Sequence, residues 1–172
     1  MNNVQQIIKN NNITPKWFIT IKFIETQSFT LSRGEAKLNI KSDNTNITKV
    51  EKSINYFINL LYQAVYGKTS TKKIREKKFQ ILTFIERGES NYSYHAHLIT
   101  EDMPIEYFEI ENILKRIQLK HKGISTKDSQ YTKAIDLRPY QYYHTSYVTK
   151  AETPRFIPFS ILTSRINTNG QH

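Results

Sequence analysis

The sequence contains no cysteine, and glycine and proline are also scarce, with five of each among 172 residues. Without thiols the chain can form no disulfide, no thiolate nucleophile and no cysteine zinc site, so any metal must be held by His, Asp, Glu or Gln. No run approaches the roughly eighteen apolar residues of a membrane-spanning helix, and residues 1–12 lack the apolar core of a signal peptide. We therefore expect a cytoplasmic protein that has no membrane partner.

Positive charge is what the sequence has in excess. Lysine and arginine number 25 against 15 aspartates and glutamates, which gives a formal net charge of +10. A surplus of this size favours a polyanionic partner, and nucleic acid is the leading candidate. A run of charge is often only a solvated loop, so this assignment depends on the rest of the site. The basic residues that we expect to contact DNA are Lys72, Lys73, Arg75, Lys77 and Lys78 in a linker, and Lys115 and Arg116 near the end of a predicted helix.

Apolar periodicity predicts the order of strands and helices. We expect a flexible arm or a frayed helix over 1–15, which are polar and Asn-rich, and a single domain over 16–172. Strands are predicted at 17–23, 79–86, 90–100 and 131–137, with an edge segment at 156–162. Helices are predicted at 44–66, from Pro104 to before Gly123, and from Pro139 through 150, while 29–40 is expected to be a hairpin or loop. This order predicts an α+β fold, in which helices pack on a central antiparallel sheet that has the hairpin 79–100 near its middle.

A pair of histidines is the first candidate for a chemical site. Residues 94–99 read YHAHLI, with His95 and His97 on either side of a small residue. Because side chains in a strand repeat every second residue, both imidazoles point to the same face, close enough to share one divalent metal. Glu86 ends the preceding predicted strand, and a hairpin can bring its carboxylate beside them, which leaves coordination positions open as a catalytic metal requires. Spacing alone also fits two surface histidines, with Glu86 paired to Arg87 or a lysine.

A second constellation lies in residues 140–150, which read YQYYHTSYVTK. If these residues form a helix, Tyr143 and Tyr147 are one turn apart on one face, and Lys150 follows beside Tyr147. A neighbouring cation favours the phenolate form of a tyrosine and also stabilises charge on a phosphate under attack. Attack of Tyr147 on a phosphodiester would give a phosphotyrosine and free a hydroxyl, so that the strand could later be rejoined. The alternative is an aromatic ridge packed against the sheet.

In combination these motifs resemble the HUH endonucleases, in particular the replication initiators that start rolling-circle replication of plasmids, phages and viruses. An apolar first motif at 17–23, the His-hydrophobic-His motif at 95–97 and a tyrosine motif at 147–150 occur in the order that the family has. Ala96 is smaller than the apolar residue usual between the histidines, and Ser146 replaces the lysine usual between two tyrosines. No phosphate-binding loop of the form GxxxxGK(S/T) is present, so we expect no helicase domain.

The resemblance implies a ferredoxin-like or RRM-like HUH fold and metal-dependent nicking and rejoining of DNA. The substrate would be single-stranded DNA or a melted origin or hairpin, held by the basic residues and by stacking on Tyr92 or Tyr94. A host helicase and polymerase are further candidate partners. The implied site comprises Mg²⁺ or Mn²⁺ held by His95, His97 and Glu86, the nucleophile Tyr147 with Tyr143 as a candidate second nucleophile, and Lys150 as an assisting cation.

Three other interpretations stay open at this point. A single-tyrosine HUH transposase shares the histidine pair and a helix-borne tyrosine, but often has glutamine rather than lysine near that tyrosine. A DNA-binding regulator could use the same scaffold without cleaving DNA. An RNA-binding sheet domain needs basic charge and stacking aromatics, but gives no role to the histidine pair.

Overall fold

The structure is a computed structural model that describes residues 3–23, 43–67, 78–87, 94–121, 123–124, 133–141, 156–157 and 164–165. Along the chain the elements are α1 (Asn3–Asn10), β1 (Trp17–Lys22), α2 (Asp43–Tyr66), β2 (Ile81–Arg87), β3 (Tyr94–Thr100), α4 (Tyr107–Lys120), β4 (Ile135–Pro139) and β5 (Phe156–Ile157). The predicted segments at 29–40 and 68–77 lie outside the described residues.

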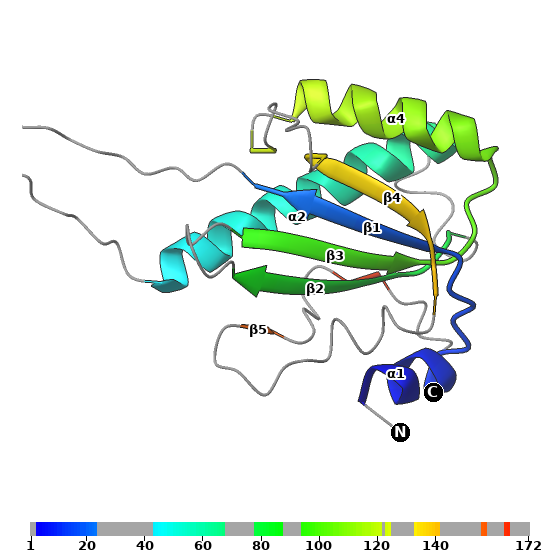
Figure 1. The fold of residues 1–172 in the computed structure, drawn as a ribbon, viewed down its shortest axis with the longest axis horizontal. Helices are drawn as coiled ribbons and strands as arrows, with labels where there is room; N and C mark the ends of the chain where they lie inside the picture. Colours follow the sequence, from blue (N-terminus) through cyan, green and yellow to red (C-terminus); the bar gives the residue numbers. More distant parts are fainter. Residues whose placement is uncertain are drawn as a thin grey trace, which may run out of the picture.

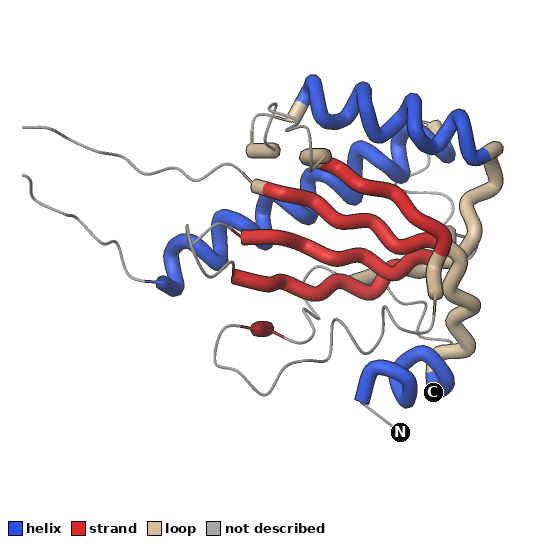
Figure 2. The backbone as a smooth tube through the Cα atoms, in the orientation of Figure 1, coloured by secondary structure: helices blue, strands red, loops and turns tan. Residues whose placement is uncertain are grey.

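The strands form one antiparallel sheet in the order β4-β1-β3-β2-β5, so that β3 lies at the centre (Figure 1). Figure 2 shows these strands side by side in the sheet, with α2 passing behind them. The succession β1-α2-β2-β3-α4-β4 places β3 between β1 and β2, which is the split βαβ arrangement of ferredoxin-like folds. The predicted α+β fold with a central antiparallel sheet is therefore confirmed, and the hairpin of β2 and β3 occupies its middle.

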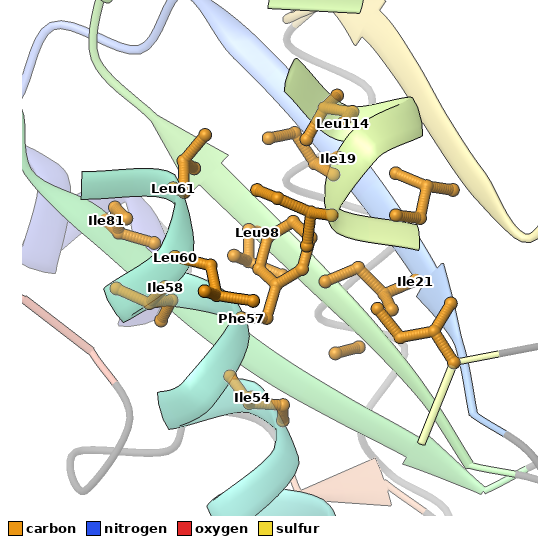
Figure 3. Close-up of a cluster of buried hydrophobic side chains, with 14 of the residues drawn as sticks. Ile19, Ile21, Ile54, Phe57, Ile58, Leu60, Leu61, Ile81, Leu98 and Leu114 are labelled. Carbon is orange, nitrogen blue, oxygen red and sulfur yellow. The ribbon is translucent and has the colours of Figure 1, made fainter. Parts of the chain in front are cut away.

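One face of the sheet is buried under α2 and α4, which also contact each other. Every second residue of β1 and β3 points to this face, and α2 supplies apolar side chains at three-and-four spacing to meet them. Figure 3 shows Phe57 of α2, Leu98 of β3 and Leu114 of α4 as members of one cluster of buried side chains. We call this face the helix side. Its fully buried side chains include Ile19, Ile21, Ile54, Phe57, Ile58, Leu61, Ile81 and Leu98.

The other face, which we call the open side, carries a smaller apolar cluster and the histidine pair. The cluster consists of Ile13, Phe18, Leu82, Phe84 and Ile99, and Ile7 and Ile8 of α1 pack against it. The N-terminal segment, which we expected to be an arm or a frayed helix, thus contains a helix that rests on this cluster. Its two isoleucines are adjacent in the sequence, and the sequence alone does not show what surface they cover.

Among the helix and strand ends that differ from the prediction, two involve a proline. The helix predicted to open at Pro104 begins at Tyr107, because the backbone at Glu106 is still extended and Glu109 accepts the Glu106 N–H at 3.3 Å. Pro139 was predicted to start a helix, but it ends β4. As β4 is an edge strand, a missing N–H is tolerated there, and the Tyr140 N–H continues the pairing by donating to the Lys16 carbonyl at 2.8 Å. Residues 142–150 lie outside the described residues.

Candidate metal centre

The histidine pair lies on the central strand and faces the open side. His97 is paired in register with Thr20 of β1 and Phe84 of β2, while His95 is paired with Lys22 and Glu86. These side chains share a face because cross-strand partners point the same way. The hairpin therefore places Glu86 beside the histidines, as its position at the end of the preceding strand suggested.

His97 is held from three directions. Its Nε2 lies 2.9 Å from Glu86 Oε2, and its Nδ1 lies 3.1 Å from Thr20 Oγ1. The ring of Phe18 stacks on the imidazole, with centroids 5.5 Å apart and planes inclined by 15°. Only 3% of His97 is exposed, so the ring is fixed in a mostly buried setting. This aims one nitrogen at the Glu86 carboxylate and the other at a hydroxyl.

His95 sits at the more open end of the same strand and is half-buried. Burial lowers its pKa, and the neighbouring His97 and Lys22 act in the same direction, while Glu86 opposes them. Because an ordinary histidine has a pKa near 6.5, this shift keeps the His95 imidazole neutral at pH 7. A neutral imidazole has a free nitrogen lone pair, which is the form that binds a metal.

The residues of this site fit a small divalent cation in part. Two neighbouring ligands of an octahedral ion, each about 2.1 Å from it, are about 3.0 Å apart. His97 Nε2 and Glu86 Oε2 are 2.9 Å apart, which is a normal hydrogen-bond distance and is also close to this ligand separation. Among the described residues, however, no three His, Asp or Glu side chains already form a group that could hold a metal. The predicted set of His95, His97 and Glu86 is therefore not preassembled in the structure.

The residues that were predicted to bind DNA and that the structure describes do not lie on the face of the histidine pair. Tyr94 is adjacent to His95 and so faces the helix side, where it is partly buried against the core. Its stacking on DNA stays a prediction. Lys78 lies over the ring of Tyr62 of α2, with Nζ 5.1 Å from the ring centroid. Lys115 and Arg116 are exposed on α4, which covers the helix side. DNA bound along the histidine face would not meet these residues directly.

Several predicted site residues lie outside the described part of the chain. They are Tyr143, Tyr147 and Lys150 of the tyrosine motif, Lys72, Lys73, Arg75 and Lys77 of the basic linker, and Tyr92. Their roles stay predictions.

Sequence reasoning missed three residues of β1 that share the face of the histidines. Phe18, Thr20 and Lys22 alternate with the apolar residues that point to the helix side. The sequence predicts a buried strand over 17–23, but polar Thr20 and Lys22 at period two indicate that its second face is more polar. On β4, Asp136 points the same way, opposite Thr20, and pairs with Arg138 at 2.6 Å.

A separate hollow of about 690 Å³ lies where β1 meets the start of α4. Trp17, Met103 and Tyr107 line it together with the carboxylates of Asp102 and Glu106. The Trp17 indole N–H donates to Asp102 Oδ1 at 3.2 Å, and Trp17 faces the helix side. The hollow is therefore distinct from the histidine face.

No protein-family model matches the chain, and no curated protein matches it at a significant level. Within the part of the chain that the structure describes, no helix is both long and apolar enough to span a membrane.

Proposed function

We propose that the chain is an HUH-type DNA endonuclease and strand transferase. It would nick single-stranded DNA at a specific site through a 5′-phosphotyrosine and start rolling-circle replication in the cytoplasm. The observation that carries this proposal is the 2.9 Å contact between His97 and Glu86 on the open side of the central strand, with His95 in register beside them. Two histidines that were merely exposed on the surface would not include a buried imidazole in contact with a carboxylate.

The proposed chemistry divides the site into a phosphate-activating part and a nucleophilic part. His95, His97 and Glu86 would hold Mg²⁺ or Mn²⁺, which when bound withdraws charge from the scissile phosphate. Lys22, register-paired with His95, adds a positive charge on the same face for the DNA backbone. Phe18 and Thr20 contact His97 and would keep it in place.

The nucleophile of the proposed reaction is the phenol of Tyr147. Its oxygen attacks phosphorus after losing its proton to solvent, with Lys150 favouring the phenolate, and the bond from phosphorus to the 3′-oxygen breaks. The 3′-oxygen takes up a proton, which leaves a 5′-phosphotyrosine and a free 3′-hydroxyl. A polymerase can extend this hydroxyl. A later hydroxyl that attacks the phosphotyrosine reverses the reaction and closes the strand.

Chain geometry supports bringing Tyr147 to this face. Tyr140 follows β4 and packs against the open-side cluster that contains Phe18, whose ring stacks on His97. The chain therefore leaves β4 on the side that carries the histidines. Tyr147 is seven residues further on, a length that spans at most about 25 Å when extended. The histidines lie two strands away on β3, so an extended segment of this length reaches them, whereas seven helical residues span only about 10 Å.

The proposal is tested by trapping the covalent intermediate. The full chain is incubated with pooled single-stranded DNA oligonucleotides and Mn²⁺, denatured, and run on a gel that separates free protein from a DNA adduct. We expect an adduct that a chelator abolishes and that Tyr147→Phe abolishes, while the control Tyr140→Phe retains it. Absence of an adduct under conditions where Mn²⁺ binds would leave a DNA-binding regulator as the better interpretation. Transfer between two ends, in place of nicking at one site, would identify a transposase.

A further inference from the structure

The hydroxyl of Thr20 is placed to interact with His97 in a way that no apolar residue could. Thr20 Oγ1 lies 3.1 Å from His97 Nδ1, and the two residues are directly paired between β1 and β3. On the other side of the ring, His97 Nε2 lies 2.9 Å from Glu86 Oε2. The imidazole thus spans a hydroxyl and a carboxylate while only 3% of the residue is exposed.

We propose that Thr20 is a positioning residue that lets His97 move its ring proton from Nε2 to Nδ1 when a metal binds. This inference rests on the proposed function, because it assumes that His97 is a metal ligand. It concerns Thr20, a residue that the predicted site did not include.

The position of the His97 ring proton depends on whether each partner donates or accepts a hydrogen bond. A carboxylate can only accept, so a neutral His97 bonded to Glu86 carries its proton on Nε2, and Nδ1 must accept from the Thr20 hydroxyl. Metal binding through Nε2 requires the opposite tautomer, in which Nδ1–H donates. A hydroxyl rotates and serves as donor in the first state and acceptor in the second. A backbone N–H or a carbonyl at the same place could satisfy only one of them.

The surroundings of His97 make this hydroxyl difficult to replace. Phe18 stacks on the ring at a centroid distance of 5.5 Å, which fixes the ring plane and hence the direction of Nδ1. Burial limits the access of water that could take over from the hydroxyl. Removing the hydroxyl would therefore take away the acceptor that Thr20 offers to the buried Nδ1–H in the metal-bound state.

The first test compares Mn²⁺ binding to the full chain by titration calorimetry in the wild type, Thr20→Val and Thr20→Ser. Valine keeps the shape and the strand preference but lacks the hydroxyl, whereas serine keeps the hydroxyl. We expect Thr20→Val to weaken Mn²⁺ binding about 10- to 100-fold and Thr20→Ser to stay within about threefold. Equal affinity of wild type and Thr20→Val would overturn the inference. Thermal melting followed by circular dichroism checks that each variant is folded.

A second measurement does not depend on any variant. Nitrogen-15 NMR of the histidine side chains reports which ring nitrogen carries the proton, with Mg²⁺ as a diamagnetic ligand. We expect His97 to be protonated on Nε2 without metal and on Nδ1 with saturating Mg²⁺. The same tautomer in both states would contradict the proposed role, even if Thr20→Val does not fold.

The outcomes separate this inference from the proposed function. If the wild type forms a DNA adduct and Thr20→Val binds Mn²⁺ as tightly as the wild type does, only the proposed role of Thr20 is wrong. If the wild type binds Mn²⁺ and changes tautomer but forms no DNA adduct, the role of Thr20 holds and the nicking activity is wrong. A wild-type chain that binds neither Mn²⁺ nor Mg²⁺ would overturn both.

Discussion

Replacing Glu86 by glutamine separates a metal site from a mere hydrogen bond. In the structure Glu86 Oε2 accepts from His97 Nε2 at 2.9 Å. Glutamine has the same length and offers an amide oxygen at the same place, so Glu86→Gln keeps the hydrogen bond and removes the charge. Since a charge-assisted bond exceeds a neutral one by about 1 kcal/mol, the metal-free variant should lose about that much stability.

Glu86→Gln should also remove most of the stabilisation that Mn²⁺ gives to the wild type. A ligand at ten times its dissociation constant stabilises the folded state by about 1.4 kcal/mol, which for a chain of this length raises the melting temperature by about 3–6 °C. A neutral amide oxygen is a much poorer ligand for Mn²⁺ than a carboxylate. With affinity reduced about 100-fold, the same Mn²⁺ concentration would stabilise Glu86→Gln by less than about 0.1 kcal/mol.

The assay is a thermal melt with and without Mn²⁺, and Asp136→Asn provides the matched control. Asp136 is a carboxylate on the same face, opposite Thr20, and it pairs with Arg138 rather than with a histidine. We expect the Mn²⁺-induced rise in melting temperature in the wild type and in Asp136→Asn, but not in Glu86→Gln. An equal rise in Glu86→Gln would refute the assignment of Glu86, and loss of the rise in Asp136→Asn would relocate the site.

Three further predictions concern the framework that carries the site. The hydroxyl of Tyr62 donates to the Phe79 carbonyl at 2.8 Å, and burial raises the pKa of this phenol. As the pH rises above about 10, the phenol therefore ionises in the unfolded chain before it does in the folded protein, and the contribution of Tyr62 to stability falls. Tyr62→Phe should therefore be about 1 kcal/mol less stable than wild type at pH 7 and equal to it near about pH 10.7 in urea titrations; a constant difference would contradict this. His121 is buried, with Nε2 2.9 Å from the Ser53 carbonyl and Nδ1 accepting a backbone N–H, so His121→Phe should lower the free energy of unfolding by about 2–4 kcal/mol in denaturant melts. Phe57→Ala should cost about 3–5 kcal/mol in the same melts, because Phe57 is fully buried between the sheet and the helices, and a loss below about 1 kcal/mol would mean that the core differs from the one described.

The sequence was sufficient for the features that follow from periodicity. Three-and-four spacing located α2, which runs Asp43–Tyr66, and period-two alternation put His95 and His97 on one face. The short connection between the two predicted strands, which are β2 and β3, favoured a hairpin, so the neighbourhood of Glu86 and the histidines was also predictable. These features depend on local spacing and on one tight connection.

Features that depend on contacts between distant segments were not predictable in the same way. Thr20 reaches His97 only because β1 inserts beside β3, a pairing of residues 77 positions apart. The packing of Ile7 and Ile8 on the open side depends on the cluster formed by three different strands. The placement of Tyr94 on the helix side, by contrast, did follow from alternation, because adjacent strand residues point to opposite faces.

The central claim is that the chain cleaves DNA by forming a covalent bond between a phosphate and Tyr147. In the most direct measurement, the chain is incubated with Mn²⁺ and pooled single-stranded oligonucleotides, and the product is denatured. The product is then digested with protease and nuclease, and mass spectrometry locates the peptide that carries a nucleotide. We predict a nucleotide phosphate on Tyr147. No modified peptide, or a nucleotide on a tyrosine of the sheet such as Tyr94, would contradict the claim.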